Sequence, residues 1–297
     1  MTLTQLRYFL ATIQAGSISK AASQVRVAQP ALSQQIGMLE AEFGQILFLR
    51  HARGVTLTEA GRRLRERATE ILRQVQLTRD ELAVDAGSPV GSVALGMATA
   101  VNMAFSVEVL TRARAQYPRI RLQLVESMSG FLREWTERGR IDLAVIYEAP
   151  PSPELYLEVL GSEDLFLITA PREARLLGEE VAFKQLADLP LVLPGLAHGL
   201  RMLVDRKAAE AGFALQMPYE VDSTYTIKRL VAQGEGCSIL SGHAVRDELA
   251  LGTLAAIRIG APGIPRSIQL AMSRGRRTDP SVAAIREIVR SVVKSAP

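Results

Sequence analysis

The chain has 297 residues, of which 48% are hydrophobic, 22% are charged and one, Cys237, is a cysteine. This composition excludes a small disulfide-stapled domain and a disordered chain, and the length predicts two or three globular domains. The formal net charge of +4 suits a nucleic-acid partner, and no apolar run approaches the roughly 18 residues that a membrane-spanning helix needs.

Three short helices are predicted within the first 43 residues. The first is amphipathic and carries an apolar face made of Leu3, Leu6, Phe9, Leu10 and Ile13. The second starts at Ser17, a good N-cap residue, and has the small residues Ala21 and Ala22 on one face. The third has Pro30 at its start, where a missing N–H costs nothing. It has a predicted buried stripe of Leu32, Ile36, Leu39 and Phe43.

The polar residues at the start of the third helix suggest a function. Gln29, Ser33 and Gln34 project opposite its apolar stripe. Amide and hydroxyl side chains at the N-terminal end of a second helix are what base reading in a DNA major groove requires. The alternative is a helical hairpin with a solvated face, and this window alone does not decide between them.

A basic hairpin follows at residues 47–57. Two short apolar strands flank Arg50 and Arg53, with Gly54 near the tip, and such a hairpin can lie along DNA phosphates. Residues 1–58 hold five basic and two acidic side chains, a net charge of +3. Most of the chain's formal net charge of +4 therefore lies in its first fifth, which favours DNA binding.

A long helix is predicted from Thr58, its N-cap, to about residue 86. It carries a heptad seam of Leu64, Ala68, Ile71, Val75, Thr78 and Leu82. Such a seam either packs on its own chain or pairs with a second helix, and the narrow seam favours pairing. The helix ends at Ala86-Gly87-Ser88-Pro89, the predicted domain boundary.

Alternating strands and helices are predicted beyond this boundary, which indicates a mostly parallel sheet or sheets covered by helices. Four loops at predicted strand ends carry small polar residues, at 98–100, 127–129, 195–201 and 222–224. Ligands in such folds bind beyond the carboxyl ends of strands, near helix N-termini. Each of these residues has an alternative role as a helix cap or a solvated surface group.

No catalytic or metal-binding motif is present. The three histidines, at 51, 198 and 243, share no metal-ligand spacing, and no nucleophile elbow or phosphate-binding loop is found. Cys237 lies in an apolar strand and is interpreted as a small core residue. We therefore predict no enzyme activity, no metal and no cofactor.

The first 61 residues resemble LysR-type transcriptional regulators. The motifs that carry this resemblance are Gly16-Ser17, Ala21-Ala22, Gln29-Pro30-Ala31-Leu32-Ser33, Gln35-Ile36, Leu39-Glu40, Leu47-Phe48, Arg53-Gly54-Val55 and Leu57-Thr58-Glu59-Ala60-Gly61. Lys20 departs from a capping box with Ser17. The Gly-Leu-Arg segment at 199–201 faintly resembles the nitrogen-assimilation-control branch.

The resemblance implies an architecture. An N-terminal, all-α winged helix-turn-helix (1–58) would precede a linker helix (59–87) and an α/β effector domain (90–297). The effector domain would resemble type 2 periplasmic binding proteins, with subdomain I at 90–162 and 267–297 and subdomain II at 163–266. The chain would dimerise through the linker helix and assemble into a homotetramer in the cytoplasm. The single cysteine and the lack of a signal sequence agree with that location.

The resemblance also implies site residues and partners. The DNA-binding residues would be Ser17, Ser19, Lys20, Gln29, Pro30, Ser33, Gln34, Arg50 and Arg53. A small anionic effector would contact Thr99, Ala100, Ser127, Ser129, Tyr147, His198, Gly199 and Arg201. Double-stranded DNA is the expected partner, together with RNA polymerase and without a membrane. Two rivals remain open, a DNA-binding repressor that senses nothing and a solute-binding protein that does not bind DNA.

Overall fold

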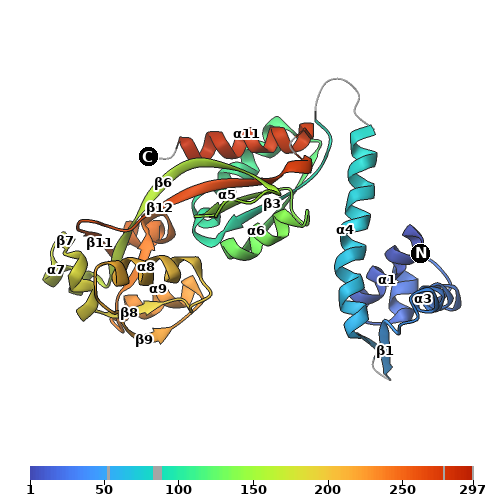
Figure 1. Ribbon diagram of the computed structural model, residues 1–297, viewed down its shortest axis with the longest axis horizontal. Coiled ribbons are helices and arrows are strands. Elements are labelled where there is room, and N and C mark those ends of the chain that lie inside the picture. Colours follow the sequence, from blue (N-terminus) through green and yellow to red (C-terminus); the bar gives the residue numbers. More distant parts are fainter. Residues whose placement is uncertain (52–53, 83–88, 277, 296–297) are drawn as a thin grey trace. The chain divides into compact units, whose positions relative to one another are not determined.

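The computed structural model describes residues 1–51, 54–82, 89–276 and 278–295 (Figure 1). The chain divides into two compact units, residues 1–85 and 86–297. One hydrophobic cluster lies in the first unit and two lie in the second. No helix within the described ranges has both the length and the apolar character that crossing a membrane requires.

The described residues of the N-terminal unit form four helices and a pair of antiparallel strands. Its elements are α1 (Leu3–Ala15), α2 (Ile18–Gln24), α3 (Gln29–Phe43), β1 (Phe48–His51), β2 (Gly54–Leu57) and α4 (Glu59–Leu82). Local chemistry sets the boundaries of its helices. A capping box of Thr2 and Gln5 starts α1, the Ser17 hydroxyl caps α2, and Gly44 ends α3 in the left-handed conformation. Pro30 occupies the second position of α3 rather than the predicted first.

The predicted stripe on α3 is confirmed at three of its four positions. Leu32, Ile36 and Leu39 are fully buried in a core shared with α1 and α2. Phe43 was predicted to be buried, but 42% of it is exposed. The reason is its position as the last residue of α3, beside the Gly44 cap, where it lines an open groove with Leu64 instead of entering the core.

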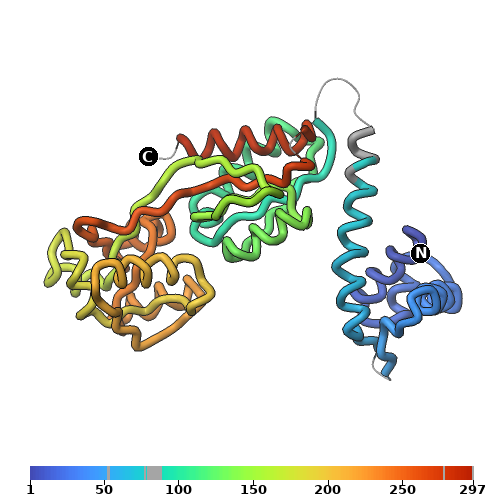
Figure 2. Tube along the Cα trace, in the orientation of Figure 1, coloured from blue at the N-terminus to red at the C-terminus, as the bar shows by residue number. Residues whose placement is uncertain are grey.

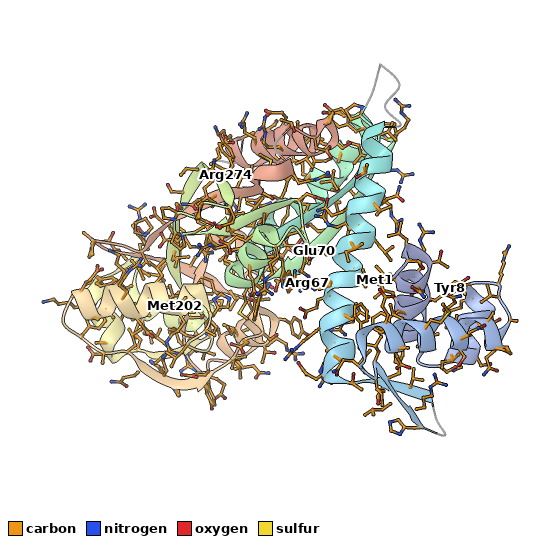
Figure 3. The ribbon with its side chains drawn as sticks, turned by 45° about the vertical axis from the view of Figure 1, so that its right-hand side comes forward. Met1, Tyr8, Arg67, Glu70, Met202 and Arg274 are labelled. Atoms are coloured by element: carbon orange, nitrogen blue, oxygen red, sulfur yellow. The ribbon has the colours of Figure 1, made fainter. Side chains whose placement is uncertain are left out.

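Helix α4 begins at the predicted N-cap, where the Thr58 hydroxyl accepts the N–H of Gly61 at 3.0 Å. Within the predicted heptad seam, Leu64, Ala68 and Ile71 pack into the core of the N-terminal unit, and Ala68 is fully buried. The surface of the helix carries ion pairs such as Arg67 with Glu70 at 3.1 Å (Figure 3). The predicted helix end and domain boundary at 83–88 lie outside the described residues.

Two glycines in this unit are expected to respond oppositely to the same change. A Cβ atom at Gly61 would lie 2.3 Å from the Leu47 carbonyl oxygen and 2.8 Å from Leu57 Cδ2, whereas one at Gly37, inside α3, would meet no atom within 4 Å. Gly61→Ala should therefore lower the free energy of unfolding by about 1–3 kcal/mol, and Gly37→Ala should raise it by about 0.5–1 kcal/mol. Urea unfolding followed by circular dichroism measures both. Shifts of the same sign would contradict this packing.

The C-terminal unit alternates strands and helices. Its first half contains β3 (Gly91–Ala98), α5 (Thr99–Gln116), β4 (Ile120–Ser127), α6 (Ser129–Glu137), β5 (Leu143–Tyr147), β6 (Leu155–Thr169), α7 (Pro171–Leu177), β7 (Glu180–Val181) and the 3-10 helix η1 (Phe183–Asp188). Its second half contains β8 (Pro190–Leu193), α8 (Gly199–Glu210), β9 (Gln216–Glu220), α9 (Thr224–Ala232), β10 (Ser238–Ser241), η2 (Gly242–Val245), α10 (Arg246–Ala250), β11 (Ala255–Ile259), β12 (Pro265–Ser273), η3 (Arg274–Arg276) and α11 (Pro280–Lys294).

The sheets are mixed rather than mostly parallel as predicted. Strand β3 pairs in parallel with β4 and β5, and β8 pairs in parallel with β9. Strand β12 runs antiparallel to both β5 and β6, and β6 is also antiparallel to β10 and β11. Every antiparallel pair of this unit includes β6, β12 or both. Strand β12 and the first half of β6 were not predicted from the sequence.

Strands β6 and β12 connect two hydrophobic cores. One core contains residues of β3, α5, β5 and α11, and the other contains residues of β8, α8, α9 and β11. Figures 1 and 2 show β6 and β12 running side by side from one core to the other. This pair of strands therefore joins the two cores.

A buried ion network fastens α11 to the first core. The Asp142 carboxylate accepts the backbone N–H of Ala94 at 2.8 Å and the Arg276 Nε–H at 3.0 Å. Arg276 also pairs with Asp279 at 2.7 Å, and Asp279 caps α11 through the N–H groups of Ser281 and Val282. The three charged side chains are at most 9% exposed, so each charge depends on the others for its stabilisation.

Candidate functional site

The outer side of α3 presents predicted DNA-binding residues to solvent. Gln29, Pro30 and Gln34 are exposed and Ser33 is half-buried, on the sides of the helix away from its buried stripe. Ser17 is partly occupied as the cap of α2, because its hydroxyl accepts the N–H of Lys20 at 3.1 Å. The Ser19 and Lys20 side chains are exposed at the start of α2.

The hairpin of β1 and β2 docks against the turn between α1 and α2. The Val55 N–H donates to the Gly16 carbonyl oxygen at 3.0 Å. Gly54 precedes it with φ +136°, and a Cβ there would lie 2.3 Å from the same oxygen, so only glycine allows this approach. Arg50 is exposed with Nη1 3.4 Å from Ser33 Oγ, which brings a cation to the edge of α3. Arg53 lies outside the described residues.

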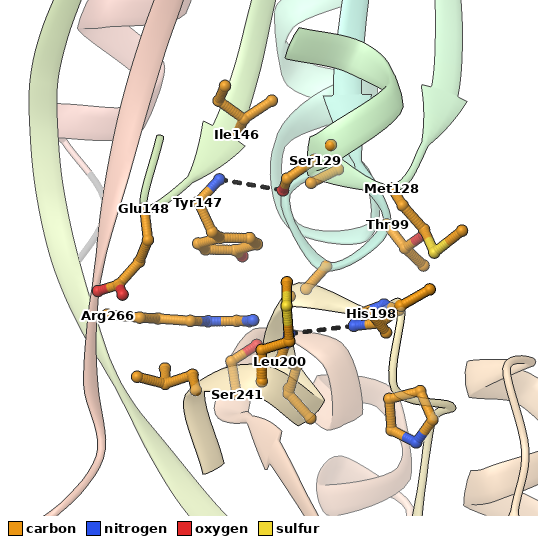
Figure 4. A pocket seen from close by; sticks show the side chains of 18 of the residues that line it. Thr99, Met128, Ser129, Ile146, Tyr147, Glu148, His198, Leu200, Ser241 and Arg266 are labelled. Carbon is orange, nitrogen blue, oxygen red and sulfur yellow. Dashed lines mark hydrogen bonds between the residues drawn. The ribbon is translucent and has the colours of Figure 1, made fainter. Parts of the chain in front are cut away.

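A cavity of about 420 Å³ lies between the two cores of the C-terminal unit (Figure 4). The first residues of α5, α6 and α8 and the last residue of β5 face it. Six of the predicted effector-binding residues line it: Thr99, Ala100, Ser129, Tyr147, His198 and Gly199. Most of its remaining wall is apolar and includes Met128, Ile146 and Leu200.

Two predicted effector-binding residues lie outside this lining. Ser127 is the last residue of β4, in register with Ala98 of β3. Arg201 is 5% exposed, and its guanidinium is paired with Asp205 at 2.7 Å and with Glu220 at 3.0 Å. Its Nη1 also donates to the Pro194 carbonyl. The charge of Arg201 thus holds α8 to β9 instead of facing the cavity.

The sequence analysis missed a buried arginine in the wall of the cavity. Arg266 of β12 is 4% exposed, and its Nε donates to Glu163 Oε1 of β6 at 2.7 Å. Its guanidinium stacks on the Tyr147 ring at 3.6 Å (Figure 4). The pattern of residues 265–273 could have predicted a strand. Because no strand was predicted there, Arg266 was not expected to lie beside β5 or β6.

An ion pair links opposite walls of the cavity. Arg206 Nη2 of α8 lies 3.2 Å from Glu148 Oε2, directly after β5. Glu148 has φ +47°, the left-handed conformation that is uncommon for a residue with a side chain. Because both residues line the cavity, its rim contains a cation whose charge is balanced by the Glu148 carboxylate.

Burial changes the protonation of two cavity residues. Removal from water raises the pKa of Tyr147 far above its usual value, so its phenol stays neutral. Burial, followed by the nearby charge of Arg266, lowers the pKa of His198, and Asp222 opposes this in part. His198 is therefore neutral near pH 7, and its Nδ1 accepts the Leu200 N–H at 3.1 Å as the cap of α8.

The depressed pKa of His198 predicts a pH effect on stability. The unfolded chain takes up a proton near pH 6.5 while the folded chain does not, so stability is complete above that pH and declines as the pH falls below it. His198→Asn keeps a cap and removes the titration. Between pH 7.5 and 5.5 the variant should lose less Tm than the wild type. Identical pH profiles of Tm would contradict the assignment.

Metal-ligating side chains and the single thiol of the chain are the other groups that can form a reactive site. No group of three or more His, Cys, Asp or Glu side chains within the described ranges is arranged to hold a metal ion. Cys237 is buried, and burial followed by the charge of Glu173 raises the pKa of its thiol to about 12. The thiol therefore stays protonated, which fits its interpretation as a core residue.

Comparisons with known proteins find matches for both the N-terminal and the C-terminal part of the chain. The family model "Bacterial regulatory helix-turn-helix protein, lysR family" matches residues 3–62, and "LysR substrate binding domain" matches residues 86–294. The nitrogen assimilation regulatory protein nac of Klebsiella aerogenes is 33% identical over 297 residues, covering 99% of this chain and 95% of that protein. Its namesake in Escherichia coli is 32% identical, covering 99% and 96%.

Solved structures share the fold at lower identity. The full-length structure of CbnR, complexed with its target DNA, has a TM-score of 0.75 at 23% identity, covering 98% of this chain and 100% of that chain. A full-length OxyR variant from Pseudomonas aeruginosa has a TM-score of 0.72 at 23% identity, covering 100% and 99%. The two family models and the nac relatives show that the chain belongs to the LysR family, as a DNA-binding transcriptional regulator with an effector-binding domain and not an enzyme.

Proposed function

We propose that this regulator is switched by a small anionic metabolite bound in the cavity between the two cores. The observation that carries the proposal is which of the helices facing the cavity have a side-chain cap at their N-terminus. Helices α8 and α9 are capped by His198 and Ser223, but α5 and α6 follow Ala98 and Met128, which provide no side-chain cap. Their first N–H groups therefore remain available to an anion, which the helix dipole also favours.

The rest of the cavity supports a ligand with an apolar body. A volume of about 420 Å³ suits a small organic acid. The Ser241 hydroxyl lines the cavity from β10, is buried, and has no hydrogen-bond partner among the described residues. Such a hydroxyl is available to a ligand. We propose Thr99, Ala100, Ser129, Tyr147, His198 and Gly199 as effector contacts, with Ser241 and Arg206 added and with Ser127 and Arg201 in supporting positions.

We further propose how the N-terminal unit uses DNA. The bases would be faced by Gln29, Pro30, Ser33 and Gln34. Contacts with the DNA backbone, which position the protein on the duplex, would come from Ser17, Ser19, Lys20, Arg50 and Arg53. Two copies would pair through α4 beyond the turns that pack on the N-terminal core, and dimers would join into a tetramer. Bound to its operator in the cytoplasm, where bacterial DNA lies, the assembly would contact RNA polymerase. Ligand couplings of this kind are worth about 1–3 kcal/mol.

The test is a DNA footprint on the regulator's own upstream region, with and without a panel of small carboxylates. We expect one compound to shorten or shift the protected region. Gly130 allows a sharp variant, because it lines the cavity at the start of α6 and a Cβ there meets nothing within 4 Å. Gly130→Val should abolish the response and keep the footprint. The matched change Gly161→Val lies in equally open space on β6, outside the lining, and should keep both.

Each outcome separates the candidate functions. Protection that no compound changes, in the wild type and in both variants, would favour a repressor that senses nothing. A response retained by Gly130→Val would place the ligand elsewhere. No protection by the wild type would contradict DNA reading at this region.

A further inference from the structure

The exposed residues of α3 are uncharged except for Glu42. On the side away from the buried stripe lie Pro30, Ala31, Gln34, Met38 and Ala41, and all five are exposed. The fifteen residues of α3 include no lysine, arginine or histidine. Its only ionic side chains are two glutamates. Helices exposed to water usually carry charged and polar residues on this side, so the outer side of α3 is suited to contact rather than to solvation.

The two glutamates of α3 are engaged beside this surface. The Glu40 carboxylate accepts the N–H groups of Leu47 and Phe48 at 2.8 and 3.2 Å, which ties α3 to the hairpin. Glu42 pairs with the amino group of Met1. Glu42 lies one turn after Met38, in the exposed stripe that also contains Gln34 and Met38. Its negative charge is balanced by the Met1 amino group, so the stripe carries no unbalanced charge that would repel a polyanion.

One cation lies beside α3. Arg50 places Nη1 3.4 Å from Ser33 Oγ, at one side of the helix, and Lys20 and Arg26 are exposed elsewhere in the same unit, on and after α2. A largely uncharged helix surface with a cation beside it suits the major groove, where bases lie between two rows of phosphates.

The side-chain types in the stripe suit particular bases. Guanine is read mainly by arginine or lysine, which α3 lacks, whereas glutamine can bond adenine and apolar side chains contact the C5-methyl group of thymine. Met38 is 52% exposed and lies one turn after Gln34 on the same side. Four residues of helix advance about 6 Å, and base pairs repeat every 3.4 Å. The two side chains thus reach positions about two base pairs apart.

We propose that Met38 contacts the C5-methyl group of a thymine about two base pairs from the base read by Gln34, so that α3 specifies A·T pairs. The inference rests on the proposed use of α3 to read DNA. It adds a specificity-determining residue at a position where the sequence analysis assigned no role.

The experiment removes only the methyl group. Selection from a random DNA library gives the preferred site, and each thymine in it is then replaced by deoxyuridine, which lacks the methyl. Dissociation constants are measured at fixed salt for the wild type and for Met38→Ala. At one thymine per half-site we expect uracil to weaken wild-type binding roughly fourfold, the effect of one buried methyl group. The same uracil should leave binding by Met38→Ala unchanged.

Ile46→Ala is the matched control. It also shortens an exposed apolar side chain of the same unit (Ile46 is 64% exposed), but it lies after α3 ends. It should keep the wild-type response to uracil. If no thymine loses its uracil effect in Met38→Ala, the methyl contact is wrong although DNA reading stands.

Two further outcomes also decide the matter. A change in oligomeric state of Met38→Ala by sedimentation, with an unaltered uracil pattern, would show that the stripe binds protein and would overturn the proposal. Failure of the wild type to select any sequence would instead contradict the proposed use of α3.

Discussion

Asp142→Ala is expected to destabilise the C-terminal unit more than any surface substitution. The change removes one partner from a network in which Asp142, Arg276 and Asp279 are all buried, and it also removes the acceptor of the Ala94 N–H. Breaking a buried ion pair on one side leaves an uncompensated charge and costs about 3–5 kcal/mol. For a unit of this size, that loss should lower the Tm by roughly 6–20 °C.

The measurement is thermal unfolding of the full chain, with Arg138→Ala as the control. Arg138 pairs with Glu134 at 2.9 Å one turn away on α6, but both side chains are exposed, so its removal should cost less than about 1 kcal/mol. Comparable losses from Asp142→Ala and Arg138→Ala would mean that the buried network adds little. Because Asp279 caps α11, hydrogen exchange should also rise at the start of that helix in Asp142→Ala.

Gln34→Ala is expected to abolish most of the sequence discrimination while leaving non-specific DNA binding intact. The exposed amide is removed from the outer side of α3, while Leu32 and Ile36 on the inner side remain buried. A good base contact of this kind contributes about 1–3 kcal/mol, which is about 5- to 150-fold in affinity per half-site. Binding to unrelated DNA depends on phosphates and should not change.

Arg50→Ala provides the contrasting result. Its guanidinium lies at the edge of α3 and is positioned to meet a phosphate, so its loss should weaken specific and non-specific binding equally. The slope of log affinity against log salt should also decrease by about 1 per contact. Mobility-shift titrations at several salt concentrations measure both variants. A Gln34→Ala protein that loses specific and unrelated DNA in equal measure would contradict the base-reading role.

The N-terminal unit could be predicted closely because its signals are local. The Ser17 cap, the Gly54 turn and the three-four spacing of Leu32, Ile36 and Leu39 each act within a few residues. Phe43 shows the limit of this reasoning, since the spacing extended past the point where the core ends. Periodicity identifies the buried side of a helix but not the residue at which the neighbouring elements stop covering that side.

Only those cavity residues that follow the ends of strands could be predicted from the sequence. Thr99 and Ser129 start helices directly after β3 and β4, and the order of elements alone brings them together. Arg266 reaches Tyr147 across a strand pairing that joins residues more than 100 positions apart, and no local signal announces it. Arg201 was predicted to face a ligand, but its partner Asp205 lies one helical turn away and Glu220 comes from β9.

The packing of α4 on the core of the N-terminal unit couples a tilt of this helix to a displacement of α3. Because Leu64, Ala68 and Ile71 fix its first turns to the unit that carries α3, we expect the helix to move together with the α3 surface proposed to read DNA. Its 24 residues extend about 36 Å. A tilt of about 5° at one end therefore displaces the other by about 3 Å, close to the 3.4 Å rise of one base pair. A small angular change can thus move the reading surface by one step along DNA.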